Sequence, residues 1–151
     1  MLADIGNGTI NIMYITNQKP DVRKCFTEKF GTNQCAILIK ERIMQTYHTT
    51  IDESTITDVM RFGTADISEK HLSVMQEAAM EYTEEIFKIL RSHEYNPETI
   101  KLYIVGGGGC LIKNFGVYDK SRVYINEDIH ATAKGYEYLA ELNMRKGGGN
   151  R

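Results

Sequence analysis

Hydrophobic and polar residues alternate over residues 9–15, where isoleucines stand at positions 10, 12 and 15. This spacing of two is that of a half-buried β-strand. Residues 16–21 then carry turn chemistry, including Pro20, which cannot continue a strand ladder. Residues 22–30 predict a return strand, and residues 2–5 read as the end of an earlier one. The chain is therefore expected to open with three short, mostly antiparallel strands.

From residue 36 onward, the hydrophobic residues recur at the spacing of helices. Residues 36–47 predict one amphipathic helix after a cap signal at residues 31–33, and a shorter helix is expected to begin near Ser54. Residues 68–93 carry the clearest helical pattern, which ends before Pro97. The apolar stripe of this third helix consists of Leu72, Met75, Ala79, Tyr82, Ile86 and Ile89.

Strands and helices alternate in the last third of the chain. Residues 101–105 form a β-rich run that enters four consecutive glycines, and residues 111–115 indicate a brief helix. A last strand is predicted over residues 123–125 and a last helix over residues 128–143. This order predicts an α/β fold, in which a mixed sheet begins with the antiparallel three-strand unit and is flanked by helices.

The bulk properties fit a single domain and argue against one class of function. The 151 residues are 42% hydrophobic and 25% charged, which is typical of a globular protein. We expect one domain over residues 1–146 and a flexible, glycine-rich tail over residues 147–151. The formal net charge of −2 argues against direct nucleic-acid binding, which needs clustered surplus Lys and Arg.

The cysteines, the histidines and the hydrophobic runs bear on compartment and metal content. Cys25, Cys35 and Cys110 are widely spaced and odd in number, which indicates reduced thiols and not a disulfide framework. The histidines do not show the spacing of a zinc site. No apolar run approaches the roughly 18 residues of a membrane helix, and no signal peptide precedes the first strand. These patterns predict a cytoplasmic protein with no membrane partner.

The first candidate for chemistry is the sequence Asp-Ile-Gly-Asn-Gly-Thr at residues 4–9, between two predicted strands. Gly6 and Gly8 permit positive φ angles and carry no side chain, so backbone N–H groups can point into a concavity that suits phosphate oxygens. Asp4 offers a carboxylate for Mg²⁺ or its waters, and for orienting an attacking water. A plain β-hairpin with an Asn-Gly turn is the simpler interpretation of the same residues.

The second candidate is the run of residues 102–109, in which a buried strand leads directly into four glycines. Bare backbone at the carboxyl edge of a sheet lies where ligands of α/β proteins tend to bind. A helix N-terminus behind it would favour an anion by about 0.3–1 kcal/mol. The run matches neither GxxxxGK[ST] nor GxGxxG, and a flexible connecting loop is the alternative interpretation.

The third candidate is the small-residue face of the last predicted helix. Ala131 and Gly135 are four positions apart, with Ala133 nearby, so another helix can approach the backbone closely. Seen alone, such a face is more typical of ordinary helix packing than of a functional site.

Together, and in this order, the three motifs resemble those of the actin, Hsp70 and sugar-kinase superfamily. Residues 4–9 resemble its second phosphate loop, residues 106–108 its adenosine motif, and residues 131–135 its second connecting helix. The resemblance covers essentially the whole chain as the second, C-terminal domain, and implies a ribonuclease H-like actin-ATPase fold. ParM/StbA-like plasmid segregation proteins look nearest, because the segment between the two loops is compact and because of the pattern over residues 128–136.

The resemblance also implies a site for ATP and Mg²⁺ in a cleft between two domains. Asp4 would be the catalytic residue, acting through Mg²⁺ waters or the hydrolytic water. Arg61 and Asp58 are candidates for contacts to adenine or ribose, although solvated surface charges are the simpler interpretation of both. The implied contacts are Gly6, Asn7, Gly8 and Thr9 for the β- and γ-phosphates, and Gly106, Gly107 and Gly108 for the α-phosphate and nucleoside.

Partners follow from the same resemblance. The first phosphate loop and first connecting helix of the superfamily have no counterpart here, and the chain opens inside a predicted strand, so we expect a missing N-terminal domain. Half a cleft should hydrolyse ATP poorly, because phosphoryl transfer depends on positioning. Head-to-tail contacts between subunits would build a filament, and DNA would be held only through an adaptor protein.

Two other functions remain open on the sequence. The chain can be a domain of a small-molecule kinase of the same superfamily, whose substrate pocket would lie mostly outside these residues. It can also be a non-catalytic, actin-like interaction domain with a decayed site.

Overall fold

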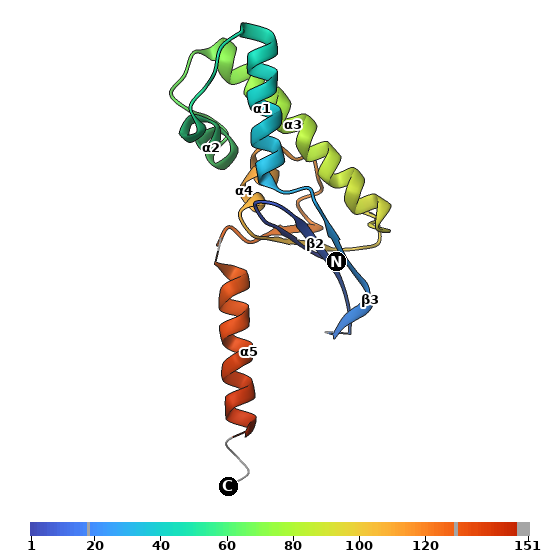
Figure 1. Cartoon of the computed structure of the whole chain (residues 1–151). Helices are drawn as coiled ribbons and strands as arrows, with labels where there is room; N and C mark the ends of the chain where they lie inside the picture. The colour runs from blue at the N-terminus through green and yellow to red at the C-terminus, as the bar shows by residue number, and fades with distance from the viewer. Residues whose placement is uncertain (18, 129, 148–151) are drawn as a thin grey trace.

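A computed structural model describes residues 1–17, 19–128 and 130–147 of the chain (Figure 1). The predicted order of strands and helices is confirmed, and with it the α/β class. The elements are β1 (Leu2–Ile5), β2 (Ile10–Thr16), β3 (Lys19–Glu28), α1 (Thr32–Tyr47), α2 (Glu53–Phe62), α3 (Glu69–Ser92), β4 (Leu102–Val105), α4 (Gly108–Phe115), β5 (Val123–Ile125) and α5 (Ala131–Gly147).

The strands form one mixed sheet in the order β3-β2-β1-β4-β5. β1, β2 and β3 are joined as antiparallel neighbours, which confirms the predicted three-strand unit. β4 runs parallel to β1, and β5 runs parallel to β4. Because β1 and β4 are parallel neighbours, their carboxyl ends lie side by side at one edge of the sheet, with Asp4 opposite Val105.

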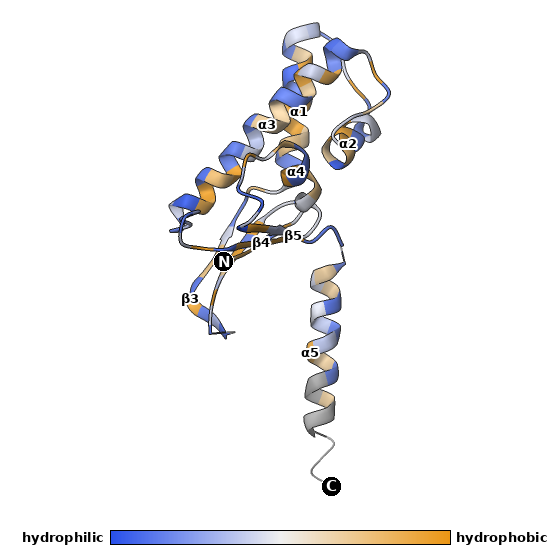
Figure 2. Ribbon diagram, turned by 180° about the vertical axis from the view of Figure 1, so that it is seen from behind, coloured by the Kyte–Doolittle hydropathy of each residue, from blue (hydrophilic) through white to orange (hydrophobic). Residues whose placement is uncertain are grey.

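The two faces of the sheet differ in what covers them. Ala3 and Ile104 are fully buried on the face that packs against α1 to α4. Their neighbours in sequence point to the opposite face, which we call the open face, and Tyr103 there is 45% exposed. The alternation follows from the period of two in a strand. α5 lies on the side of the open face and extends away from the sheet (Figures 1 and 2).

The helical layer is built around α3. Ile39 and Ile43 of α1 and Ile86 and Leu90 of α3 are fully buried in one hydrophobic core cluster. Of the predicted stripe on α3, Met75, Ala79, Tyr82 and Ile86 are buried, and Leu72 and Ile89 are partly buried. The stripe prediction is therefore confirmed in outline.

One boundary prediction is wrong. Pro20 was expected to end a strand in a turn over residues 16–21, yet β3 begins at Lys19 and Pro20 pairs with Ile15. β3 is the edge strand of the sheet, so one side of its backbone has no neighbouring strand. A proline is tolerated there because its missing N–H can face away from the ladder.

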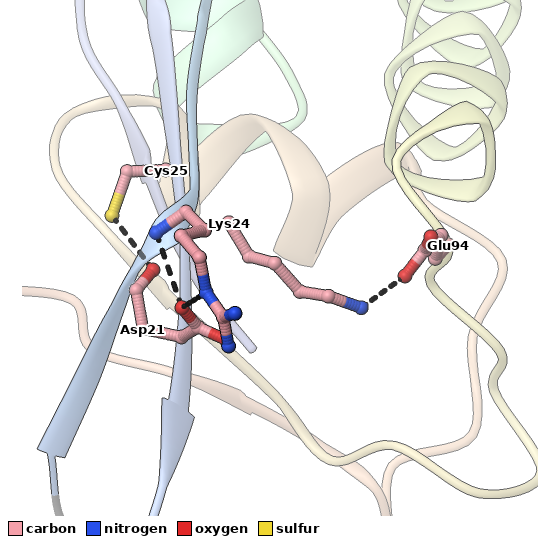
Figure 3. A network of polar contacts seen from close by, with 5 residues as sticks. Asp21, Lys24, Cys25 and Glu94 are labelled. Carbon is pink, nitrogen blue, oxygen red and sulfur yellow. Dashed lines mark hydrogen bonds and ion pairs between the residues drawn. The ribbon is translucent and has the colours of Figure 1, made fainter.

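The β2–β3 hairpin is fastened to the end of α3 by polar contacts. The Lys24 side chain reaches across from β3 to an ion pair with Glu94 (Figure 3). Further along β3, the His93 ring stacks on Phe26 with ring centroids 4.4 Å apart, and His93 Nε2 lies 2.7 Å from Glu28 Oε1. These contacts hold the second half of β3, from Lys24 to Glu28, against the end of α3.

The last helix differs in extent from the prediction. A helix was predicted over residues 128–143, whereas α5 spans Ala131–Gly147. Gly147, expected in the flexible tail, is the last residue of this helix, and residues 148–151 of the predicted tail lie outside the described residues. Within the described part of the chain, no helix combines the length and the apolar character that crossing a membrane requires.

Candidate functional site

The structure places the two glycine-bearing bends next to each other. The first bend, residues 6–9, follows the carboxyl end of β1, and the second bend, Gly106 and Gly107, follows that of β4. Because these strands are adjacent and parallel, both bends lie at the same edge of the sheet. This is the edge at which ligands of α/β folds usually bind.

The first bend is held by the beginning of α1. The Gly6 N–H donates to the Thr9 carbonyl oxygen (2.9 Å) and closes a tight hairpin. The carbonyl oxygen of Gly6 accepts from the Thr32 N–H (3.0 Å), and that of Asn7 accepts from the Asn33 N–H (2.8 Å). The bend therefore satisfies amides at the helix N-terminus that have no partner inside the helix.

This attachment orients the other edge of the same peptide groups. In a planar trans peptide, the N–H points opposite to the carbonyl. Since the Gly6 and Asn7 carbonyls face α1, the N–H groups of Asn7 and Gly8 point away from it. Neither amide has an acceptor in the part of the chain that the structure describes. Two unpaired donors on neighbouring residues make a site that suits an anion such as phosphate.

The physical origin of this arrangement differs from the prediction. Gly6 and Gly8 permit positive φ angles but do not adopt them, since among the described glycines only Gly63 and Gly106 have a positive φ. The amides are directed outward because α1 binds the carbonyls, without any left-handed residue in the bend.

Gly31 is a site-building residue that the sequence did not reveal. The sequence indicated only a break after the strand and a possible helix cap at residues 31–33. In the structure, a Cβ at Gly31 would lie 2.6 Å from the Thr9 nitrogen and closer still to the Asn7 carbonyl. Its carbonyl oxygen accepts from the Tyr82 hydroxyl on α3 (2.7 Å). Burial, with a smaller contribution from Cys35, raises the pKa of Tyr82, so this hydroxyl stays protonated. Gly31 is thus held between the first bend and α3.

The second bend fits against β1. Gly106 has a φ of +86°, and a Cβ there would lie 2.5 Å from Asp4 Oδ1 and 2.7 Å from the Ile5 carbonyl oxygen. A Cβ at Gly108 would lie 2.7 Å from the Ile5 Cβ. Glycine is therefore required at both positions by close approach to β1. Gly107, by contrast, is exposed, and a Cβ there would meet nothing within 4 Å.

The four glycines do not form one loop. Gly108 and Gly109 are buried in the first turn of α4, so only Gly106 and Gly107 connect β4 to this helix. The expectation that all four glycines lie in a loop was therefore wrong, and so was the alternative of a flexible connecting loop over these residues. A glycine-rich first turn lets α4 lie closer to the sheet than side chains would permit.

A small pocket of about 240 Å³ begins at Gly107 and is bounded by α1, α2 and α4. Arg61, one of the two predicted nucleoside contacts, lines it, whereas Asp58 is exposed outside it. Thr32 also lines the pocket, and its amide and hydroxyl bond the first bend, the hydroxyl at 3.5 Å from Asn7 Oδ1. The pocket is also lined by residues that no sequence motif marked as ligand contacts, namely Thr57, Met60, Cys110 and Leu111.

Asp4 lies half-buried on the open face, beside both bends. Its Oδ1 faces Gly106, and its Oδ2 accepts a hydrogen bond from the Thr132 hydroxyl of α5 (3.1 Å). No group of three or more His, Cys, Asp or Glu side chains gathers within the described residues. A single carboxylate of this kind fits Mg²⁺, which commonly combines one or two protein carboxylates with waters and substrate phosphates.

Comparison with known proteins identifies the fold. No model of a protein family matches the chain, and the search of curated proteins found no match. Among solved structures, the archaeal actin homologue Ta0583 in complex with ADP is 16% identical over 93% of this chain and 48% of its own, with a TM-score of 0.70. Bacillus thuringiensis ParM with ATP is 14% identical over 95% of this chain and 46% of its own, with a TM-score of 0.68.

These similarities show an actin-like ATPase domain fold, which confirms the fold that the resemblance implied. The chain spans about half the length of each of these structures. A second Ta0583 structure agrees, with a TM-score of 0.73 over 94% of the chain.

Proposed function

We propose that residues 1–146 are the nucleotide-binding second domain of an actin-like ATPase, and that they hold ATP with Mg²⁺ at the two glycine-bearing bends. The observation that carries the proposal is the adjacency of these bends at the ends of β1 and β4. The outward amides of Asn7 and Gly8 and the pocket that begins at Gly107 support it.

Each part of the nucleotide has a candidate partner. The β- and γ-phosphates are assigned to the first bend, Gly6 to Thr9, because its free amides suit anions. The α-phosphate and nucleoside are assigned to Gly106, Gly107 and Gly108, with the nucleoside in the pocket that Arg61 lines. At about 240 Å³, this pocket is smaller than the roughly 300–1,000 Å³ of complete ligand pockets. A missing N-terminal domain would supply the other wall.

Asp4 is the proposed catalytic residue, through Mg²⁺ waters or the water that attacks the γ-phosphate. Bound Mg²⁺ would neutralise charge on the phosphates, which is its usual contribution to phosphoryl transfer. The protein's own contribution is to hold the Asp4 carboxylate between Gly106 and Thr132, at the edge of both bends. Because one domain forms only half of the cleft, hydrolysis is expected to need the second domain.

The cellular role is proposed from the family resemblance. In that view the complete protein assembles head to tail into filaments and serves the segregation of a plasmid or mobile element. The likeness to Bacillus thuringiensis ParM agrees with this role. The archaeal actin homologue Ta0583 matches equally well, so the choice of the ParM branch rests on the sequence motifs. The net charge of −2 agrees with DNA being held through an adaptor.

The test is a Gly107→Val substitution in the complete protein that carries this domain. The φ of Gly107 is −62°, which valine adopts readily, and its Cβ meets no protein atom, so the variant should fold. The valine would instead occupy the space assigned to the nucleotide. Calorimetric titration with Mg²⁺ and ATP should show binding to the wild-type protein and at least about a hundredfold loss in the variant.

Gly135→Ala is the matched control, because that glycine also has open space around it but lies on α5, away from the pocket. It should bind ATP as the wild type does. Normal ATP affinity in the valine variant would refute the nucleoside assignment, and no ATP binding by the wild-type protein would refute the function. ATP-dependent pelleting would then test the filament, and substrate-dependent release of ADP would instead indicate a kinase.

A further inference from the structure

The beginning of α5 is fastened to the sheet through a short linker. The Asn126 N–H donates to the Ile104 carbonyl oxygen (2.9 Å), which continues the β4 edge. Asp128 then accepts from the His130 N–H at Oδ1 (2.9 Å) and from Lys134 Nζ at Oδ2 (2.6 Å). These bonds lower the pKa of Asp128, the Lys134 bond being the larger cause, and they define where the first turn of α5 lies.

From that first turn, Thr132 reaches the candidate catalytic carboxylate. Its hydroxyl donates to Asp4 Oδ2 (3.1 Å), across 128 positions of sequence. The other carboxylate oxygen, Oδ1, faces Gly106, where even a Cβ would lie only 2.5 Å away. The carboxylate is therefore confined on one side by the second bend and directed on the other by α5.

We propose that Thr132 is a positioning residue for Asp4, which couples the seating of α5 to Mg²⁺-dependent nucleotide binding. The proposal rests on the function proposed above. The terminal torsion of an aspartate is broad, so a carboxylate without a fixed donor rotates easily. The hydrogen bond from the Thr132 hydroxyl restricts this rotation in Asp4, whose carboxylate oxygens would contact a Mg²⁺-bound water.

The hydrogen bond from Thr132 leaves the Asp4 carboxylate with further acceptor sites. An ionised carboxylate has about four acceptor sites, so Asp4 can accept from Thr132 and from a metal-bound water together. Coupling between two sites is reciprocal. If Thr132 orients Asp4 for the metal, then bound Mg²⁺ and ATP must in turn hold the first turn of α5 more firmly on the sheet.

A purely structural role for Thr132 would have a different signature. It would change the stability of α5 but would leave the effect of Mg²⁺ on ATP affinity intact. The informative quantity is therefore the ratio of the ATP dissociation constants without and with Mg²⁺, and not the ATPase rate.

The experiment compares Thr132→Val, which removes the hydroxyl at nearly constant shape, with Thr132→Ser, which keeps it. ATP affinity of the complete protein is titrated in EDTA and in Mg²⁺. The valine variant should bind ATP as the wild type does in EDTA. The ratio of its ATP dissociation constants without and with Mg²⁺ should be about five- to tenfold smaller than in the wild type, and the serine variant should keep the wild-type ratio. Hydrogen exchange of the α5 amides should slow on adding Mg²⁺ and ATP in the wild type and serine variant, but not in the valine variant.

An unchanged Mg²⁺-dependent gain in the valine variant, with ATP bound normally, overturns the role of Thr132 alone. An equal loss in the serine and valine variants also overturns it, because the hydroxyl would then be irrelevant. Failure of the wild-type protein to bind ATP at all overturns the proposed function, and the role of Thr132 with it.

Discussion

The two faces of the sheet differ in burial and in the kind of side chain that they carry. On the face beneath α1 to α4, the strand side chains are aliphatic and fully buried, as Ile5, Ile12 and Ile104 show. On the open face, the exposed rings of Tyr103 and Tyr124 stack on each other at 5.0 Å, beside the half-buried Asp4. α5 touches this second face at its first turn, while Tyr136, further along, is 70% exposed.

The covered face of the sheet serves the stability of the fold, whereas the open face carries groups of the candidate site. The covered face excludes water and contributes, together with the helices above it, the apolar burial that stabilises the fold. The open face and the adjoining edge carry the groups that a ligand can reach, namely the two bends and Asp4. Substitutions on the two faces should therefore differ sharply in their effects, even when they are neighbours in one strand.

The largest expected effect tests this contrast within β4. Ile104→Ala removes a fully buried side chain from the covered face, so the free energy of unfolding should fall by about 2–5 kcal/mol. Tyr103→Ala removes a half-exposed ring from the open face, so the loss should be about 1 kcal/mol or less. Urea unfolding followed by circular dichroism measures both. Equal losses would mean that the open face is covered in solution.

A second, smaller effect is expected where the site meets the helical layer. Gly31→Ala places a Cβ 2.6 Å from the Thr9 backbone nitrogen, so the first bend must move or α1 must shift. Such overpacking should cost about 1–3 kcal/mol. Gly8→Ala, where a Cβ meets nothing within 4 Å, is the matched control and should unfold almost as the wild type does. A stable Gly31→Ala variant would show that this contact is looser than described.

The smallest expected effect concerns the order in which a thiol reagent modifies the three cysteines, which reports on their burial. Burial raises the pKa of the Cys35 thiol to about 12, whereas Cys25 is exposed on β3 and Cys110 is half-buried at the pocket. Because the thiolate is the reactive form, a thiol reagent at pH 8 should modify Cys25 first and Cys110 next. Cys35 should react only on unfolding. Peptide mass mapping over time gives the order, and early labelling of Cys35 would contradict its burial.

The same thiol gives the sign of a pH effect. The pKa of Cys35 is higher in the folded protein than its usual value of 9.0, so folding favours the neutral thiol. This contribution to stability is complete below about pH 9 and declines as the pH rises toward 12. Cys35→Ala should abolish that part of the alkaline decline.

The order of elements could be predicted from the sequence because local spacing determines it. The alternation over residues 9–15 and the stripe on α3 each reflect a single element against one core. The family resemblance indicated that the two glycine motifs serve one nucleotide site. The pairing of β1 with β4, which brings them to one edge of the sheet, is not contained in local patterns and came from the structure.

The features that could not be predicted depend on contacts between distant residues. The need for glycine at Gly31 comes from a bend 22 or more positions earlier, and the bond between Thr132 and Asp4 spans 128 positions. The helical state of Gly108 was missed because four adjacent glycines look like a loop. The reason for glycine at positions 106 and 108 is close packing on Ile5. In each case the reason for the residue lies in a neighbour that only the folded chain supplies.

Pro20 has a consequence beyond the boundary of β3. A long edge strand offers free backbone groups on which another β-strand can grow, which is a common route to aggregation. Proline near the start of β3 and the charged Lys19, Asp21 and Arg23 around it discourage such growth at this edge, and at the other edge β5 has only three residues. Any ordered polymer of this domain should therefore be joined through helices and loops, with no sheet continuing from one subunit to the next.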